Sequence, residues 1–280
     1  MRIKITSDST CDMSKELLDR YHVTVLPLTV VKDGAQYRDG VTITPQEIFD
    51  HVAAGGSLCS TSAVSIGEYG EFFSRYSSDY DAVIHLNISA EFSSCFQNAT
   101  LAAESFPNVR VIDSRNLSTG HGLVVLEAAR LAEELEDLDE ICTRLREFTG
   151  RVEASFVLKR LDYMVKGGRC SSAKALGANL LNLRPCIEVK DGKMLVGKKY
   201  RGAYDKCLVS YIKDRLTERE DLCHERIFLT HTTMQDEDLQ AARDALSRYG
   251  VFAEVLETTA GCTVSCHCGP DTLGILFVRK

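Results

Sequence analysis

A histidine near the end of this chain has a setting that favours chemistry. His267 lies two residues before a Gly-Pro pair at 269–270, between two apolar runs, which predicts that a loop presents its imidazole. With a reference pKa of ~6.5, a histidine can donate a hydrogen bond to an anion or carry a proton near neutral pH. The alternative is a turn histidine that only bonds a backbone carbonyl.

Three clusters of hydroxyl side chains lie far upstream of this histidine, at residues 7–10, 60–62 and 93–94. Asp8 and Ser9 come directly after the first predicted strand, and the segment before residue 94 follows a later one. In open α/β sheets ligands lie beyond the carboxyl ends of the strands, so we expect these segments to meet at one rim. Together they indicate a site for an anionic head group.

Ser93 and Ser94 precede a helix-like apolar segment, in the position of an N-cap. Unpaired backbone N–H groups and the positive end of the helix dipole suit such a position to a carboxylate or phosphate. The alternative is that both serines only cap the helix, as this residue type commonly does. For Thr61 and Ser62 the alternative is hydrogen bonding within a loop, or a cap for the next helix.

Short β-like runs alternate with amphipathic helical patterns along the chain, which predicts an α/β fold with mostly parallel or mixed sheets flanked by helices. The length of 280 residues favours two α/β domains, at 1–152 and 153–280. Strands are predicted at 3–7, 23–31, 82–86, 109–112, 153–158, 227–230, 251–255 and 273–278, with a hairpin over 187–196. Helices are predicted at 12–21, 45–52, 66–76, 122–134, 140–148, around 161–165, 171–180, 203–216 and 237–249, and a helix-like segment follows Ser93 and ends near residue 105.

Composition excludes several classes of protein. Hydrophobic residues at 44% and charged residues at 26% are typical of a globular protein, and the net charge of -7 argues against a nucleic-acid surface. The start of the chain is too short and polar for a signal peptide, and no run approaches the ~20 apolar residues of a membrane span, which predicts a cytoplasmic protein. The eleven cysteines lack a dense disulfide framework and are expected to be reduced thiols.

Cofactor and nucleophile motifs are also missing from the sequence. Cys262, Cys266, Cys268 and His267 lack the Cys-x2-Cys spacing and the second ligand cluster of a zinc site, so structural thiols are favoured. No Gly-x-Ser-x-Gly elbow, Gly-x-Gly-x-x-Gly or Walker motif occurs, which argues against hydrolase chemistry and nucleotide binding.

In combination, these motifs resemble the DegV family over nearly the whole chain. The family's Ser-Asp-Ser/Thr motif is similar to residues 7–10, its Thr-Ser pair to 61–62, and its serine-rich motif to 89–99. Further similarities lie at residues 113–114, 118, 120, 161–169, 184–185, 191–192 and 267–270. Ser94 and Cys95 replace the family's Gly-Thr, and Asp271 replaces a glycine, departures that bear on the head-group pocket rather than on the fold.

Characterised members of that family are the fatty-acid-binding subunits of bacterial fatty-acid kinase. The resemblance therefore implies two α/β domains that bury one long-chain fatty acid between them, its carboxylate held chiefly by Thr61, Ser93 and His267. The ligand-binding residues expected on this basis are Asp8, Ser9, Thr61, Ser62, Ser93, Ser94, His267 and Gly269. The resemblance implies no catalytic residue, metal or cofactor in this chain.

A protein partner is implied as well. In the family, a separate ATP-dependent kinase subunit converts the bound carboxylate to an acyl phosphate for phospholipid synthesis, and Arg201 and Arg169 resemble residues that dock it. For the basic segment 198–201 the alternative is a solvated hairpin edge. Neither nucleic acid nor stable membrane insertion is expected.

Two other functional classes remain open from the sequence. A stand-alone enzyme acting on a small acyl or phosphorylated ligand is suggested by Asp8 and His267 as an acid/base pair. A lipid sensor that keeps the pocket without a kinase is suggested by the changed residues Ser94, Cys95 and Asp271.

Overall fold

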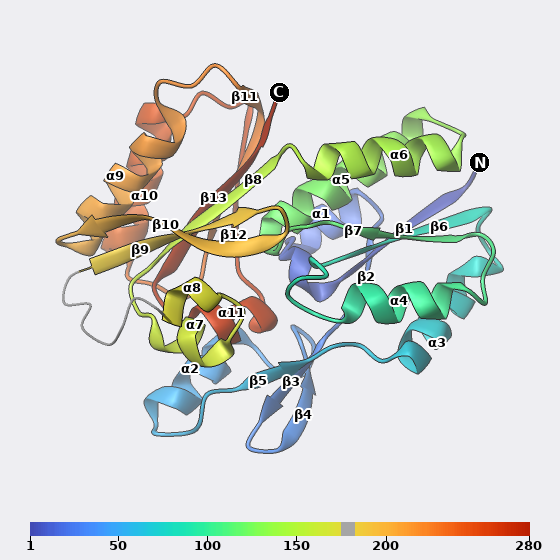
Figure 1. Ribbon diagram of the computed structural model, residues 1–280, viewed down its shortest axis with the longest axis horizontal. Helices are drawn as coiled ribbons and strands as arrows, with labels where there is room; N and C mark the ends of the chain where they lie inside the picture. Colours follow the sequence, from blue (N-terminus) through green and yellow to red (C-terminus); the bar gives the residue numbers. More distant parts are fainter. Residues whose placement is uncertain (175–182) are drawn as a thin grey trace.

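The structure is a computed structural model that describes residues 1–174 and 183–280 (Figure 1). Its first sheet has four strands in the order β2-β1-β6-β7, and every pairing is parallel. These strands are β1 (Ile3–Asp8), β2 (Thr24–Leu26), β6 (Ala82–Asn87) and β7 (Val109–Asp113). The helices of this half are α1 (Lys15–Arg20), α3 (Ile66–Ser77), α4 (Cys95–Ala103), α5 (Ser118–Glu134) and α6 (Leu138–Thr149), with a 3-10 turn at Ser9–Cys11.

The second sheet has six strands in the order β10-β9-β8-β13-β11-β12 and is mixed. Its strands are β8 (Val152–Leu158), β9 (Leu183–Lys190), β10 (Lys193–Arg201), β11 (Leu222–His231), β12 (Glu254–Thr259) and β13 (Thr272–Arg279). Side chains alternate across β8: Val157 packs with α9 (Tyr204–Leu216) and α10 (Asp236–Tyr249), whereas Phe156 faces the opposite core. The short helices α7 (Asp162–Gly167), α8 (Ser171–Lys174) and α11 (Cys262–Cys268) lie below this sheet in Figure 1.

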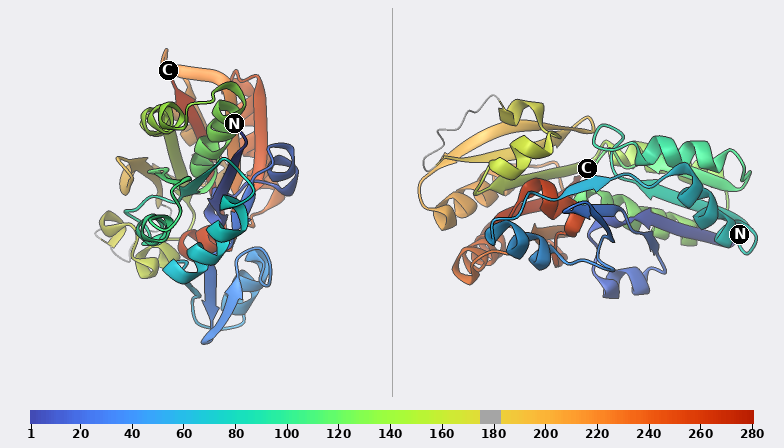
Figure 2. Two further views of the ribbon diagram at one scale, coloured as in Figure 1. Left: turned by 90° about the vertical axis from the view of Figure 1, so that its right-hand side faces the viewer. Right: turned by 90° about the horizontal axis from the view of Figure 1, so that it is seen from below.

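A third, smaller sheet was not foreseen from the sequence. It is antiparallel in the order β4-β3-β5, built from β3 (Thr29–Lys32), β4 (Ala35–Arg38) and β5 (Ser60–Ser62), with α2 (Pro45–Ala53) between β4 and β5 in the chain. Figure 2 shows it projecting from the body of the molecule. Thr44 and Glu47 form a capping box at the start of α2, with Pro45 as the first helical residue, which confirms the predicted start of that helix.

Helix α5 joins the two large sheets. Twelve of its 17 residues are buried, and its Val124 belongs to a core cluster that contains Ile84 of the first sheet and Leu276 of the second. A Cβ on Gly122 would lie 2.8 Å from the carbonyl oxygen of Cys11, so only glycine permits this approach. One hydrophobic core therefore contains residues from both sides of position 152. The division into two domains at that point stays a prediction.

The predicted α/β class, with parallel and mixed sheets flanked by helices, is confirmed, and the deviations have local causes. The hairpin turns at Asp191 and Gly192, both with positive φ, as the Asp-Gly pair predicts. The strand predicted at 251–255 is wrong by a few residues, because the chain pairs with β11 only from Glu254 onward. Of the helix predicted at 171–180, α8 covers four residues, and 175–182 lie outside the described residues.

Two further findings concern the described part of the chain. No helix there combines the length and apolar character needed to cross a bilayer. All eleven cysteines are free, and each of them except the half-buried Cys223 is buried.

Helix α11 is held at its N-terminus by carboxylates from distant parts of the sequence. The buried side chain of Asp39 accepts hydrogen bonds from the backbone N–H groups of Cys262 at 2.8 Å and Thr263 at 3.1 Å. It also accepts from the hydroxyl of Thr263 at 2.6 Å and from that of Ser9 at 2.9 Å. Asp12 Oδ1 accepts from the N–H of Gly261 at 2.9 Å. These carboxylates satisfy N–H groups that a helix leaves unpaired.

We expect the substitution Asp39→Ala to lower the free energy of unfolding by about 2–4 kcal/mol, because it removes an N-cap and leaves buried donors without an acceptor. Chemical denaturation measured by circular dichroism provides the check. Asp50→Ala, at an exposed carboxylate on α2 that accepts from Gln46 Nε2, is the control and should cost under about 0.5 kcal/mol. Equal effects of the two substitutions would contradict the role assigned to Asp39.

Candidate ligand-binding site

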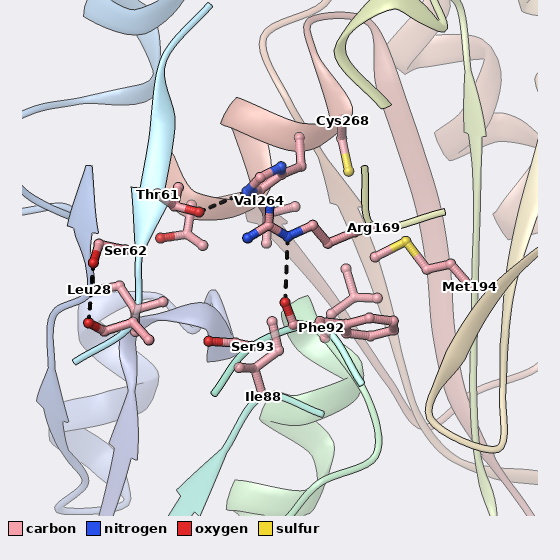
Figure 3. Close-up of a pocket in the computed structure, with 14 residues that line it drawn as sticks. Leu28, Thr61, Ser62, Ile88, Phe92, Ser93, Arg169, Met194, Val264 and Cys268 are labelled. Carbon is pink, nitrogen blue, oxygen red and sulfur yellow. Dashed lines mark hydrogen bonds between the residues drawn. The ribbon is translucent and has the colours of Figure 1, made fainter. Parts of the chain in front are cut away.

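A cavity lies where α11, β5, the start of α4 and the hairpin β9-β10 meet (Figure 3). Its lining combines apolar and polar side chains from both halves of the chain. The lining residues are Leu28, Thr61, Ser62, Ala63, Ile88, Phe92, Ser93, Leu117, Arg169, Met194, Thr263, Val264, His267 and Cys268. The described residues thus bring together Thr61, Ser62, Ser93, His267 and Arg169, which the sequence analysis singled out separately.

The polar end of the cavity contains a direct hydrogen bond between two of the predicted residues. Thr61 on β5 and His267 on α11 are 206 positions apart, and Thr61 Oγ1 lies 2.8 Å from His267 Nε2 (Figure 3). The prediction that a loop carries His267 is wrong: it lies in the last turn of α11. The Gly-Pro pair that suggested a loop follows directly after the helix end.

Burial sets the charge of His267. Desolvation, with a smaller contribution from the positive charge of Arg169, lowers the pKa of His267 to about 4. The imidazole is therefore neutral at pH 7, with one nitrogen protonated. Its Nδ1 is buried without a hydrogen-bond partner among the described residues, and it faces Gly167, where a Cβ would lie 2.5 Å from that atom. The absence of a side chain at Gly167 thus makes room for the histidine.

Arg169 supplies the positive charge of the cavity. The structure places it in the lining, whereas the family resemblance implied a docking role. Its guanidinium donates to two backbone carbonyls, at 2.8 Å to Gly167 and 3.5 Å to Phe92 (Figure 3). None of the lining residues, all within the described part, carries a carboxylate. The site therefore has a cation without an anionic partner.

The two adjacent serines have different positions. Ser93 lines the cavity, and its hydroxyl accepts from the N–H of Cys95 at 3.2 Å and donates to Cys95 Sγ at 3.1 Å at the start of α4, so it must turn from that sulfur to donate to a ligand. Ser94 is exposed and its side chain makes no capping hydrogen bond. Ser62, on β5, lines the cavity rim and is exposed.

Four other predicted residues lie outside the lining. Asp8 is fully buried beneath the cavity, where it accepts from the N–H of Ile88 at 2.8 Å and from Thr10. Ser9 donates to Asp39, and Gly269 follows α11, where a Cβ would lie 2.7 Å from the ring of Tyr163. Arg201 is exposed at the end of edge strand β10. Asp8 and Ser9 thus bond to residues that line or support the cavity, and Gly269 packs against Tyr163.

The apolar end of the cavity continues towards a second, smaller one. Leu117, Val264 and Cys268 line both, so that these three side chains form the partition. The cavities measure about 50 Å³ and about 30 Å³, below the ~300 Å³ at which small-molecule pockets usually begin. An extended apolar ligand would therefore fit only after the partition and neighbouring side chains move.

Several lining residues were missed by the sequence analysis. Leu28, Ile88, Phe92, Leu117, Met194 and Val264 are apolar residues of the kind found in any core, so no local signal marks them. Asp39, which fixes α11, lies directly after β4 in an isolated β-bridge with Ile43 and was not recognised either. Among the described residues, no three His, Cys, Asp or Glu side chains are placed to hold a metal ion.

Comparisons with known proteins agree with one another. A family model described as "Uncharacterised protein, DegV family" matches residues 2–280. The DegV domain-containing protein TTE1491 of Caldanaerobacter subterraneus subsp. tengcongensis is 32% identical, over 100% of this chain and 99% of that protein. A DegV domain-containing protein of Deinococcus radiodurans is 30% identical, over 98% of each.

Solved structures show the same similarity. A DegV family protein from Thermus thermophilus, described by its fatty acid binding, superposes with a TM-score of 0.90 at 30% identity, with 100% of each chain covered. DegV of Bacillus subtilis, described as a fatty acid binding protein, gives a TM-score of 0.85 at 25% identity with the same coverage. Because the family model and these relatives match essentially the whole chain, this protein belongs to the DegV family.

Proposed function

We propose that this protein binds one long-chain fatty acid and presents its carboxylate to a separate ATP-dependent kinase subunit, which converts it to an acyl phosphate. The observation that carries the binding proposal is the Arg169 cation, which has no ion-pair partner among the described residues and lies beside a neutral histidine and hydroxyl groups at one end of an apolar cavity. Solved family members described as fatty-acid-binding support it, including the proteins from Thermus thermophilus and Bacillus subtilis.

The polar end matches a carboxylate in charge and in hydrogen bonding. A carboxylate only accepts hydrogen bonds, and leaving it unpaired on burial is costly. If His267 Nε2 donates to Thr61 Oγ1, the hydroxyl hydrogen of Thr61 is free to point at the ligand. Ser93 and the guanidinium of Arg169 add further donors, with charge-assisted bonds worth about 1.5–3 kcal/mol each.

The apolar end accounts for a long tail. Each buried methylene contributes about 0.8 kcal/mol, so a long acyl chain supplies most of the affinity and the head group sets its orientation. Leu28, Ile88, Phe92, Met194 and Val264 offer such a surface next to the polar end. Since the unliganded cavity is small, chain entry requires these side chains to separate, and the second cavity beyond Leu117 is the nearest additional space.

The small-substrate enzyme is less well supported by the geometry. It needs Asp8 and His267 as an acid/base pair, yet Asp8 bonds Thr10 and the backbone of Ile88 while His267 bonds Thr61. The histidine nearest to Asp8 is His121, whose Nδ1 is 3.7 Å from the carboxylate. Two separate hydrogen-bond networks therefore hold the two residues.

The head-group assignment predicts unequal effects of substituting the adjacent serines. Ser93→Ala should weaken fatty-acid binding about 10-fold or more, since it removes a hydrogen bond worth about 1.5–3 kcal/mol, and His267→Ala should do the same. Ser94→Ala is the matched control and should bind as the parent does. Fluorescent fatty-acid titration, with mass spectrometry of extracted lipid, measures this. Parent-like affinity in Ser93→Ala and His267→Ala would refute the assignment.

The lowered pKa of His267 predicts a pH-dependent stability. In the unfolded chain this histidine titrates near its usual 6.5, whereas the folded value is about 4. As the pH falls from 6.5 to 4 the unfolded state therefore binds a proton that the folded state does not, and stability declines. His267→Gln should show a shallower decline between about pH 7 and about pH 5 in urea denaturation. Because His85 and His121 are present in both proteins, parallel curves would disprove the assignment.

The kinase step predicts that acyl phosphate forms only when a kinase subunit and ATP are added to the loaded protein. Trapping with hydroxylamine measures the product. Arg201→Glu should lower its rate several-fold while fatty-acid affinity stays unchanged, because Arg201 is exposed and lies outside the cavity lining. Lys206→Glu, an exposed cation on α9, is the control. Product from the purified chain with ATP alone would overturn the carrier role.

A further inference from the structure

A larger cavity of opposite character lies between the start of β8, the end of α9, the hairpin turn of β9-β10 and the loop after β7. It measures about 360 Å³, and we call it the cationic cleft. Five of its lining residues are basic: Arg115, Lys190, Arg215, Arg219 and Arg279. None of them belongs to the lining of the cavity described above.

The charges in the cationic cleft do not cancel. Against its five basic residues stand three acidic ones, Glu153, Glu188 and Asp191, which leaves an excess of two positive charges in a chain whose net charge is -7. Glu153 alone has two guanidinium groups within 3 Å, from Arg215 at 2.5 Å and Arg219 at 2.8 Å. Arg219 also pairs with Asp221, which does not line the cleft. The lining itself therefore keeps its positive excess.

Several donors of the cationic cleft lack partners among the described residues. The Nε atoms of Arg215 and Arg279 are buried there without a hydrogen bond, although Arg279 Nε is 3.9 Å from Glu153 Oε2. Arg115 and Lys190 are exposed on the cleft wall and form no ion pair with any residue in the described ranges. A buried donor without an acceptor is costly, so an anion placed here would be stabilised.

The backbone at Arg115 is held in an unusual conformation. Its φ is 52°, in the left-handed region that non-glycine residues rarely adopt. The carboxylate of Asp113 fixes this conformation by accepting from the N–H of Arg115 at 2.8 Å. Gly192 of the hairpin lies next to this residue, since an added Cβ there would be in ordinary contact with Arg115 Cβ at 3.7 Å. A rarely adopted backbone conformation, held by a specific hydrogen bond, thus keeps Arg115 on the wall.

The chemistry of the cationic cleft selects a class of ligand. Guanidinium groups match phosphate oxygens in a planar, two-pronged geometry, and the volume lies in the range of small-molecule pockets. The lining is unsuited to an acyl chain because most of it is charged. We propose that the cationic cleft is a binding site for a small, soluble, phosphate-bearing anion.

The proposal does not depend on fatty-acid binding, because it uses other residues. Residues that are neighbours in the sequence nevertheless line the two different cavities. Asn116 lines the cationic cleft and the next residue, Leu117, lines the cavity of the candidate site. In the hairpin, Gly192 lines the cleft and Met194 lines that cavity.

Isothermal titration calorimetry of the unliganded full-length protein tests the proposal, with pyrophosphate and inorganic phosphate as probes. We expect saturable binding of pyrophosphate, tighter than that of phosphate, that weakens as salt is added. The double variant Arg115→Ala/Lys190→Ala should bind at least about 10-fold more weakly, since two charge-assisted contacts are lost. Both residues are exposed, so the fold should be retained, which a denaturation midpoint verifies.

Arg75→Ala/Lys206→Ala removes the same charge from two exposed sites elsewhere and should bind pyrophosphate as the parent does. Absence of saturable binding, or an equal loss in the two double variants, would overturn the proposal. Sedimentation with phosphatidylglycerol vesicles distinguishes a lipid head group as the phosphate source. If Arg115 and Lys190 were needed for vesicle binding while pyrophosphate did not bind, the soluble ligand would be wrong.

Discussion

The cap that Asp39 places on α11 is the interaction on which the candidate site depends. This helix has seven residues, too few to be stable alone, so its position comes from its contacts. The carboxylate of Asp39, which follows β4, receives two backbone N–H groups and a hydroxyl from α11. These bonds connect the small antiparallel sheet to a helix more than 200 residues later in the sequence. They place Thr61 on that sheet within hydrogen-bond distance of His267 on that helix.

The electrostatics of the site follow from that junction. Because α11 is enclosed by β5 and α7, His267 is largely desolvated and stays neutral, with Gly167 against its Nδ1. A neutral imidazole bonded to Thr61 leaves Arg169 as the cation of the lining. The lining thus offers one guanidinium, together with hydroxyl groups on separate elements, to an anionic head group. One ionised group with neutral donors suits one carboxylate better than a multiply charged phosphate.

Sequence patterns were sufficient for the elements with clear periodicity. The parallel strands, the long helices and the hairpin at Asp191 and Gly192 were predicted because apolar alternation and turn residues determine them locally. The residues of the polar end were also identified, through hydroxyl clusters that the fold brings together. Helix α11 was missed because its cap, Asp39, comes from another part of the chain, and a short buried helix has no polar face to reveal its period. The apolar lining was missed for a similar reason, since burial of these residues depends on tertiary contacts.

The candidate cavity and the cationic cleft are lined by neighbouring residues of the same two segments, and this bears on how a long ligand enters. The candidate cavity must enlarge to accept an acyl chain, and its α11 wall is fixed at one end by Asp39 and Asp12. Met194 on the hairpin and Leu117 before α5 line other walls of the same cavity. The same two segments carry Gly192 and Asn116 into the cationic cleft. A displacement of either segment that widens the candidate cavity would therefore also move residues that line the cationic cleft.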